Sequence, residues 1–224
     1  MFEIIFVEYF FDLFYNFCMK KLCIFCTVFI LLIQASFAVE LTNLLQKKSE
    51  DVKPQNSPIG QQANILYAEN DIKKAFELLV SIPARERTAQ NWLLMGNILQ
   101  DLGKTEDAFF MYNQAAATDS NDFKAFYNLG NVYLNEEKPS LAIEEYKKVL
   151  KLKPEYPYAY YNMGCAYIKS GDLKKARNAF LNAVALKNTD ADFHYNLAYV
   201  YKKLGDEKRA KLYLDYYNKI INAY

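Results

Sequence analysis

The chain has 224 residues, 52% of them hydrophobic, while glycine (7) and proline (6) are scarce. Scarce glycine and proline argue against a loop-rich β protein and favour long helices. The formal net charge is +1. No overall field therefore draws the chain to nucleic acid or to an anionic membrane.

Residues 19–38 have the three parts of a secretory signal peptide. A short positive stretch (19–21) precedes an apolar stretch (22–33), and Ser36 and Ala38 are the small residues that a signal peptidase requires. The apolar stretch is shorter than the roughly 20 residues of a transmembrane helix. We therefore expect cleavage after Ala38 and a periplasmic or secreted protein. An uncleaved signal that anchors the chain in the inner membrane is the alternative.

The segments on either side of this signal differ from it in composition. Residues 1–18 are apolar and aromatic but carry three acidic side chains, a pattern that fits no export signal. We interpret them as the product of a misplaced start, with translation beginning at Met19; a genuine hydrophobic extension of the signal is the alternative. Residues 39–57 are polar, which predicts a flexible linker.

From residue 58 onwards, the chain repeats itself at a regular spacing. The small residues that define the period are Gly96, Gly130, Gly164 and Ala198, and an alanine follows each of them at a fixed distance, namely Ala108, Ala142, Ala176 and Ala210. Four positions before the small residues stand Trp92, Phe126, Tyr160 and His194. A weaker unit contains Ala63 and Ala75, which precede Gly96 and Ala108 by one residue less than the regular period. Such strict periodicity indicates a solenoid of stacked helical units.

These positions resemble the tetratricopeptide repeat pattern, W-x2-L-G-x2-Y…A-x3-F…P, whose period is about 34 residues. Only Pro154 fills the proline position. The resemblance covers residues 58–224. It implies an all-α fold, a right-handed superhelical solenoid of five helix–turn–helix repeats. The expected repeats are residues 58–88, 89–122, 123–156, 157–190 and 191–224.

Turn residues separate the two amphipathic stretches of each repeat. The residues that we expect in a left-handed conformation at the end of the first helix are Asn70, Gly103, Gly171 and Gly205. The residues that we expect to cap the second helix are Asp71, Asp172 and Asp206. In the third repeat, Pro139 is expected at the first helical position. In the first repeat, Ile82 and Pro83 are expected to cut the second helix short.

Members of this family usually bind a peptide or a helix in a concave groove lined by the first helix of each repeat. The residues that the pattern places there are Leu93, Asn97, Gln100, Tyr127, Asn131, Leu134, Tyr161, Cys165, Ile168, Tyr195, Tyr199 and Lys202. The tyrosines offer rigid contact area, and Asn97 and Asn131 can pair with a peptide backbone. The alternative is that these residues are only the generic composition of the repeat.

Some family members hold the C-terminal carboxylate of a chaperone through paired basic residues and two asparagines. Asn97 and Asn131 match the asparagines of that site. The basic positions, however, hold Leu93, Tyr161 and Cys165. This departure argues against a receptor for chaperone tails.

The residue inventory argues against an enzyme. The chain has one histidine, His194, and three of its four cysteines (Cys18, Cys23 and Cys26) fall in the N-terminal segments, so only Cys165 lies among the repeats. We expect no catalytic, cofactor or metal site, and we expect His194 to be a packed structural residue. Basic residues alternate with glutamates on the second helices, so nucleic-acid binding is not expected.

We therefore expect an exported scaffold or adaptor that binds a peptide or a helix of an envelope protein. A membrane-tethered structural subunit of an envelope complex, with an uncleaved signal anchor, is the alternative. A regulatory subunit of an envelope enzyme would use the same groove. In none of these cases does the membrane contact the chain except through an uncleaved signal.

The final helix carries more apolar residues than a terminal helix needs. These are Leu212, Tyr213, Tyr216, Tyr217, Ile220 and Ile221. One interpretation is that the residues between them solvate the outer face, namely Lys211, Asp215, Asn218 and Lys219. The other is a docking face there, for a partner or for a homodimer through the C-terminal helix.

Overall fold

A computed structural model describes residues 58–223, and all regular structure in this part of the chain is helical. The helices are α2 (Pro58–Ala68), α3 (Ile72–Ser81), η1 (Ala84–Glu86), α4 (Ala89–Asp101), α5 (Thr105–Thr118), α6 (Phe123–Asn135), α7 (Pro139–Leu152), α8 (Pro157–Lys169), α9 (Leu173–Leu186), α10 (Ala191–Lys203) and α11 (Glu207–Ile221). The predicted N-terminal extension, signal peptide and linker lie outside the described residues.

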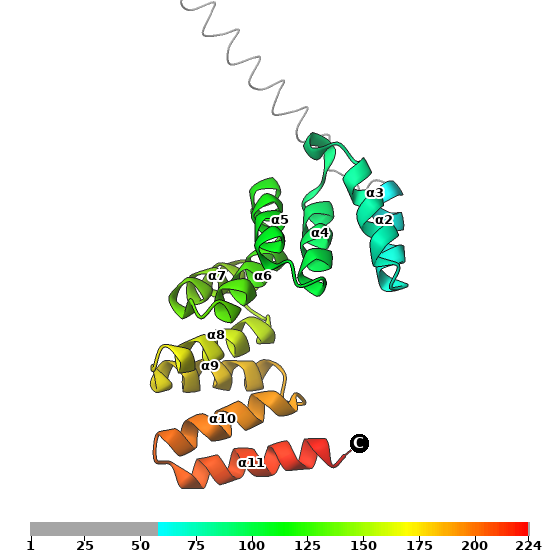
Figure 1. The fold of residues 1–224 in the computed structure, drawn as a ribbon. Helices are drawn as coiled ribbons and strands as arrows, with labels where there is room; N and C mark the ends of the chain where they lie inside the picture. Colours follow the sequence, from blue (N-terminus) through cyan, green and yellow to red (C-terminus); the bar gives the residue numbers. More distant parts are fainter. Residues whose placement is uncertain (1–57, 224) are drawn as a thin grey trace, which may run out of the picture. The chain divides into compact units, whose positions relative to one another are not determined.

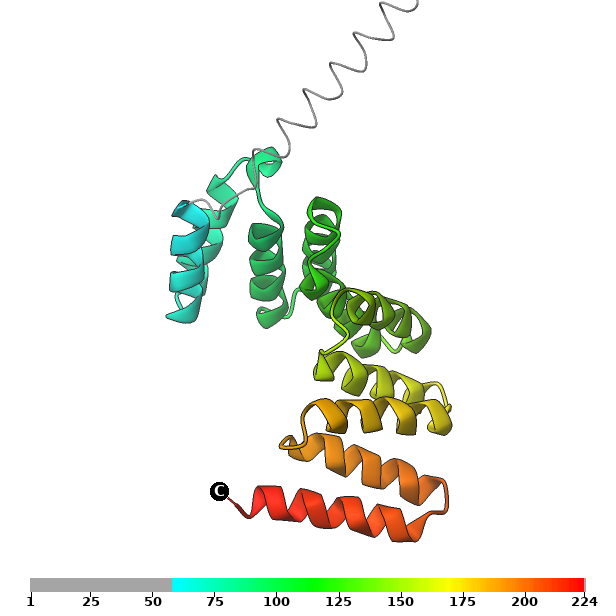
Figure 2. The ribbon, with the colours of Figure 1, turned by 180° about the vertical axis from the view of Figure 1, so that it is seen from behind.

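The α-helices form hairpin pairs that are stacked in chain order, from α2–α3 to α10–α11 (Figures 1 and 2). Each first helix packs against its own second helix, and from α4 onwards also against the second helix of the preceding pair. The first helices of the last four pairs begin at evenly spaced residues, Ala89, Phe123, Pro157 and Ala191. The predicted all-α solenoid of helix–turn–helix units is confirmed.

The turns inside the pairs use the predicted residues. The left-handed residues are Asn70 (φ 63°), Gly103 (φ 73°), Gly171 (φ 80°) and Gly205 (φ 80°). The third pair is different, because Glu137 takes the left-handed conformation (φ 57°) and Pro139 then occupies the first turn of α7. A proline is tolerated there because its missing N–H would have no partner inside the helix.

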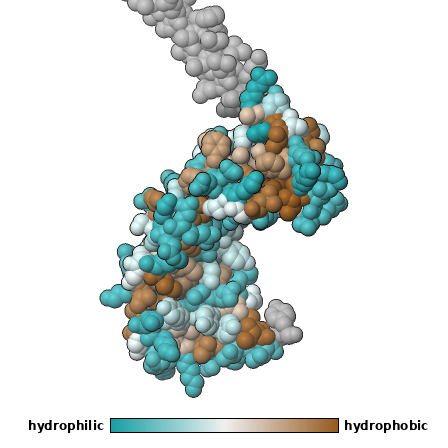
Figure 3. Space-filling view, viewed as in Figure 1, coloured by the Kyte–Doolittle hydropathy of each residue, from teal (hydrophilic) through white to brown (hydrophobic). Residues whose placement is uncertain are grey.

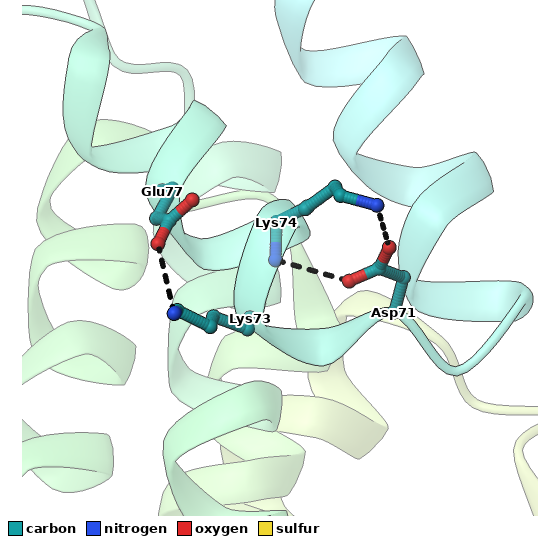
Figure 4. A network of polar contacts seen from close by, with 4 residues as sticks. All are labelled: Asp71, Lys73, Lys74 and Glu77. Carbon is teal, nitrogen blue, oxygen red and sulfur yellow. Dashed lines mark hydrogen bonds and ion pairs between the residues drawn. The ribbon is translucent and has the colours of Figure 1, made fainter.

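The three predicted aspartate caps are confirmed at α3, α9 and α11. Asp71, Asp172 and Asp206 each accept a hydrogen bond from the backbone N–H of the third residue along the chain. Each carboxylate also forms an ion pair with the side chain of that same residue; for Asp71 this is Lys74, at 2.7 Å (Figure 4). The hydrogen bond from Lys74 lowers the pKa of Asp71 below its usual value. These caps satisfy N–H groups that the first helical turn leaves open.

The link between the first and second pairs contains a cap that the sequence analysis missed. Helix α3 ends at Ser81, before Ile82 and Pro83, as predicted. Helix α4 then begins with a buried reciprocal pair: Thr88 Oγ1 accepts from the N–H of Asn91, and Asn91 Oδ1 accepts from the N–H of Thr88 (3.2 and 3.0 Å). Asparagine replaces the glutamate or glutamine of the usual capping box.

Close contact between the two helices of a pair depends on the recurrent small residue. A Cβ atom placed on Gly130 would lie 2.6 Å from Tyr146 Cε1, and one on Gly164 would lie 2.6 Å from Phe180 Cε1. Gly96 meets the ring of Tyr112 in the same way. These three rings are among the most buried side chains of the described residues. The paired helices therefore approach closely only because these positions carry no Cβ atom.

We predict that Gly130→Ala destabilises the protein. The added methyl group overpacks the buried Tyr146 ring, at a cost of about 1–3 kcal/mol, against the roughly 1 kcal/mol that alanine gains in a helix. We expect a net loss of up to about 2 kcal/mol in the free energy of unfolding, measured by urea denaturation.

The control places Gly130→Ala in a Tyr146→Leu background, which copies the Ala198 and Leu214 combination of the last pair. The loss should disappear there because leucine leaves room for the methyl group. An equal loss in both backgrounds would show that the ring contact is not its cause.

Candidate protein-binding groove

The predicted groove residues lie on the first helices α4, α6, α8 and α10. Leu93 is only 9% exposed and packs in the core cluster at the N-terminal end. At the other end, Tyr195 and Tyr199 are 52% and 41% exposed. Half-buried positions between these extremes are Asn97, Gln100, Tyr127, Asn131, Leu134, Tyr161, Cys165 and Ile168, while Lys202 is exposed. The surface open to a ligand is therefore carried by the positions other than Leu93.

Asn131 links three helices through a single oxygen atom. Its Oδ1 accepts from Tyr146 Oη on α7 (2.8 Å) and from Asn162 Nδ2 on α8 (2.8 Å). One repeat earlier, Asn97 Oδ1 accepts from Asn128 Nδ2 (3.0 Å) and shares the single Tyr112 hydroxyl proton with Gln100 Oε1, at 3.0 and 2.7 Å from Tyr112 Oη. The Asn131 side chain also hydrogen-bonds to the Tyr127 hydroxyl, whereas the Asn97 Nδ2 group has no hydrogen-bond partner among residues 58–223. Asn97 can therefore donate to a ligand carbonyl without breaking an internal bond.

A second row of asparagines, which the sequence analysis missed, makes these links. Asn128, Asn162 and Asn196 stand one repeat apart, and each donates to the preceding first helix. Asn162 also donates to Tyr127 Oη (3.0 Å), and Asn196 donates to Tyr161 Oη (2.7 Å). The period was visible in the sequence, in the recurrent Tyr-Asn pairs. What it did not reveal is that these amides orient the groove tyrosines.

In the fourth pair, α8 and α9, different residues occupy the positions of the hydrogen-bonded asparagine and tyrosine. Cys165 stands where the earlier repeats have asparagine, and Phe180 stands where they have tyrosine. Because Phe180 has no hydroxyl group to satisfy, the acceptor at position 165 is not needed. Tyr161 instead stacks on the Phe193 ring of the next repeat, with ring centroids 4.8 Å apart.

The groove side chains at its centre are electrically neutral. Burial raises the pKa of Tyr127 and Tyr161 above the usual value, so both hydroxyls stay protonated. Burial likewise raises the pKa of the Cys165 thiol to about 11. A thiol with this pKa is a poor nucleophile at neutral pH. The site can thus supply hydrogen bonds and aromatic surface.

At the C-terminal end, Tyr195, Tyr199 and Lys202 face an open hollow between α10 and α11. The other residues that line it are Ala198, Glu207, Ala210, Lys211 and Leu214. We call these eight residues the C-terminal hollow. The sequence analysis predicted its α10 side only. Leu212, Tyr216 and Ile221 of α11 are also exposed. The space-filling view shows hydrophobic residues scattered among polar ones on the face that it draws (Figure 3).

His194 is buried, at 4% exposure, as expected for a structural residue. Its Nε2 lies 2.8 Å from the carbonyl oxygen of Asn188, and its ring packs against Tyr213 and Tyr216. Among the described residues, no group of three or more His, Cys, Asp or Glu side chains is placed to hold a metal ion. No helix between residues 58 and 223 is both long and apolar enough to cross a membrane.

Comparisons with known proteins agree with this architecture. A family model for the TPR repeat matches residues 96–136, 140–171 and 164–205, and a tetratricopeptide repeat model matches residues 191–221. No curated protein sequence matches the chain.

Several solved structures of MamA are similar in fold. The chain is 20% identical to a crystal structure of MamA, with a TM-score of 0.66 over 72% of this chain and 95% of that one. For MamA from Desulfovibrio magneticus RS-1, beginning at residue 41 of that protein, the identity is 22% and the TM-score 0.67, over 74% and 94% of the two chains. At these identities the similarity shows a common fold alone.

We predict that the hydrogen-bonding pair of the third repeat can be moved to the fourth. Phe180→Tyr alone should destabilise by about 1–3 kcal/mol, because it buries a hydroxyl beside a weak acceptor. Adding Cys165→Asn should supply the acceptor and give a favourable coupling of about 0.5–1.5 kcal/mol. The measurement is a double-mutant cycle by urea denaturation. Strictly additive effects would contradict the pairing.

We also predict that the folded protein protects Cys165 from alkylation. The unfolded thiol has a pKa of about 8.5, and burial raises it to about 11. Because the neutral thiol is favoured in the fold, its stabilising contribution is complete below about pH 8.5 and is lost as the pH rises through about 11.

At about pH 8, iodoacetamide should therefore modify Cys165 on the order of a hundredfold more slowly in the folded chain than in urea, as followed on its peptide by mass spectrometry. Equal rates in the two states would contradict the burial of the thiol.

Proposed function

The chain belongs to the tetratricopeptide repeat family, and we propose that it is an exported scaffold that holds a peptide or a helix of an envelope protein in its concave groove. The observation that carries this proposal is the row of oriented tyrosines and asparagines on the first helices. Tyr127 and Tyr161 are held by amides of the next repeat, while Asn97 keeps a donor for a ligand.

The chemistry of the row favours a particular kind of ligand. The Asn97 Nδ2 group can donate to a backbone carbonyl, and tyrosine rings offer apolar area with little loss of entropy on binding. Because the centre of the groove is neutral, it suits a segment recognised through its backbone and apolar side chains. A ligand that binds mainly through a carboxylate would find no paired cations at Leu93, Tyr161 and Cys165.

Export is proposed from the sequence of residues 19–38, with its positive start, its apolar stretch and its small residues before position 39. The second candidate is a structural subunit that stays tethered by the same apolar stretch. Mass spectrometry of the N-terminus of the protein from its own cells separates the two. A chain that begins at Val39 supports export and release, while a chain that retains residues 19–38 supports tethering.

The groove is tested by photo-crosslinking of the full-length protein in its own cells. We predict that p-benzoylphenylalanine at Tyr161 gives a discrete adduct with one envelope protein. The same group at Glu144, an exposed residue on α7, should not, because α7 is a second helix. An adduct from Glu144 with none from Tyr161 would contradict groove binding.

Asn97→Asp provides a sharper variant of this test. Aspartate keeps an oxygen to accept from Asn128 but removes the Nδ2 donor and adds a charge. We expect at least a roughly tenfold loss of adduct, at an unchanged melting temperature. The matched control is Asn182→Asp, the same change at an exposed residue of α9, which should leave the adduct intact.

A further inference from the structure

One interface recurs between successive helical pairs, and it has two complementary halves. The receiving half is formed by the two helices of a pair; in the fourth pair it includes Ala176 and Phe180, both 0% exposed. The inserted half comes from the first helix of the next pair, where Val200 packs in the same cluster and is also 0% exposed. Ala166 packs in the same manner against Ala142 and Tyr146 one repeat earlier.

The C-terminal hollow is the receiving half of this interface without its insert. Its members Ala210 and Leu214 stand one full repeat after Ala176 and Phe180. Leu214 is 42% exposed, whereas the equivalent Phe180 is 0% exposed. Among residues 58–223, no helix covers this face as α10 covers the fourth pair.

The N-terminal end of the row exposes the opposite half. Ile65 on α2 is equivalent to Ile98 on α4. The number of residues between them is the same as that between the repeat alanines Ala75 and Ala108. Ile98, Val132, Ala166 and Val200 are the inserted residues of the later first helices, and none is more than 1% exposed. Ile65 is 52% exposed. A β-branched apolar side chain thus occupies the inserted position with no described residue over it.

We propose that a second copy of this chain docks head to tail, with its α2 seated on the C-terminal hollow of the first. The contact would continue the interface already present between successive pairs of one chain. It joins the two ends that leave the most repeat-interface surface uncovered, Ile65 on one copy and Leu214 on the other. Such a contact is heterologous, so each copy keeps one end free for another.

Charge at the rim is complementary in this arrangement. Within the chain, the C-terminal ends of successive first helices meet, as shown by the hydrogen bond from Tyr67 Oη on α2 to Asp101 Oδ2 on α4 (2.5 Å). A docked copy in the same register brings the exposed Glu69, just after α2, next to Lys202 and Lys203 at the end of α10. Opposite charges at a rim favour the correct register.

The inference does not depend on the groove proposal, and complementary variants test it. The full-length chain is purified in mild detergent, and its self-association is measured by sedimentation over a wide range of concentration. Ile65→Glu damages only the inserting end and Leu214→Glu only the receiving end. Each variant alone should lose self-association, with the dissociation constant raised at least about tenfold. Mixed together they should form a one-to-one pair, because one intact end of each kind remains.

Several outcomes would overturn the proposal. If Ile65→Glu associates like the parent chain, the contact is a symmetric dimer through the C-terminal helix or another surface. A monomeric parent chain at every concentration also overturns it. The matched controls are Val80→Glu and Leu212→Glu, at similarly exposed residues of α3 and α11 (50% and 46%) outside the proposed contact. If they abolish association equally, general hydrophobicity is the cause and the proposal fails.

A charge reversal keeps the test independent of any loss of folding. Lys202→Glu should weaken association, and Glu69→Lys on the other copy should restore it when the two variants are mixed. Circular dichroism on each variant establishes that the helices are intact. Absence of restoration, with both variants folded, would contradict the proposed register.

Discussion

The contact between a glycine of the first helix and a buried ring of the second helix, in the three central pairs, is the constraint on which the rest of this structure depends. At Gly96, Gly130 and Gly164, a Cβ atom would collide with the ring opposite, so the helices can meet closely only without one. The buried rings of Tyr112 and Tyr146 are thereby fixed, and their hydroxyls reach the asparagines of the first helix. The close packing of the paired helices and the hydrogen bonds of the asparagine row therefore both depend on the small residue of the first helix.

The polar row in turn joins the repeats and orients the tyrosines of the proposed groove. Asn128 and Asn162 carry hydrogen bonds from one repeat to the one before it, and the oxygens of Asn97 and Asn131 are used internally. The nitrogen of Asn97 remains for a ligand. One set of residues therefore serves both the stability of the stack and the proposed recognition. A substitution that tests recognition must remove the amide nitrogen and keep the oxygen that bonds within the stack.

Much of the fold could be predicted from the sequence because each device is local and recurs. The period located the small residues, the left-handed turns and the aspartate caps, and Ile82-Pro83 marked the early end of α3. Periodicity could not say which atoms pair, so the Asn128, Asn162 and Asn196 row was missed. Nor could it show that Leu93 is buried while Tyr195, at the equivalent position, is open. That difference depends on whether another helical pair covers the position.

The central claim is that the first helices present the binding surface, and hydrogen–deuterium exchange tests it most directly. The full-length chain would be compared with and without the partner identified through the groove. The account predicts slower exchange in peptides from α6 and α8 and no change in α7 and α9, since only the first helices contact the ligand. Protection confined to the second helices, or to α11, would contradict it.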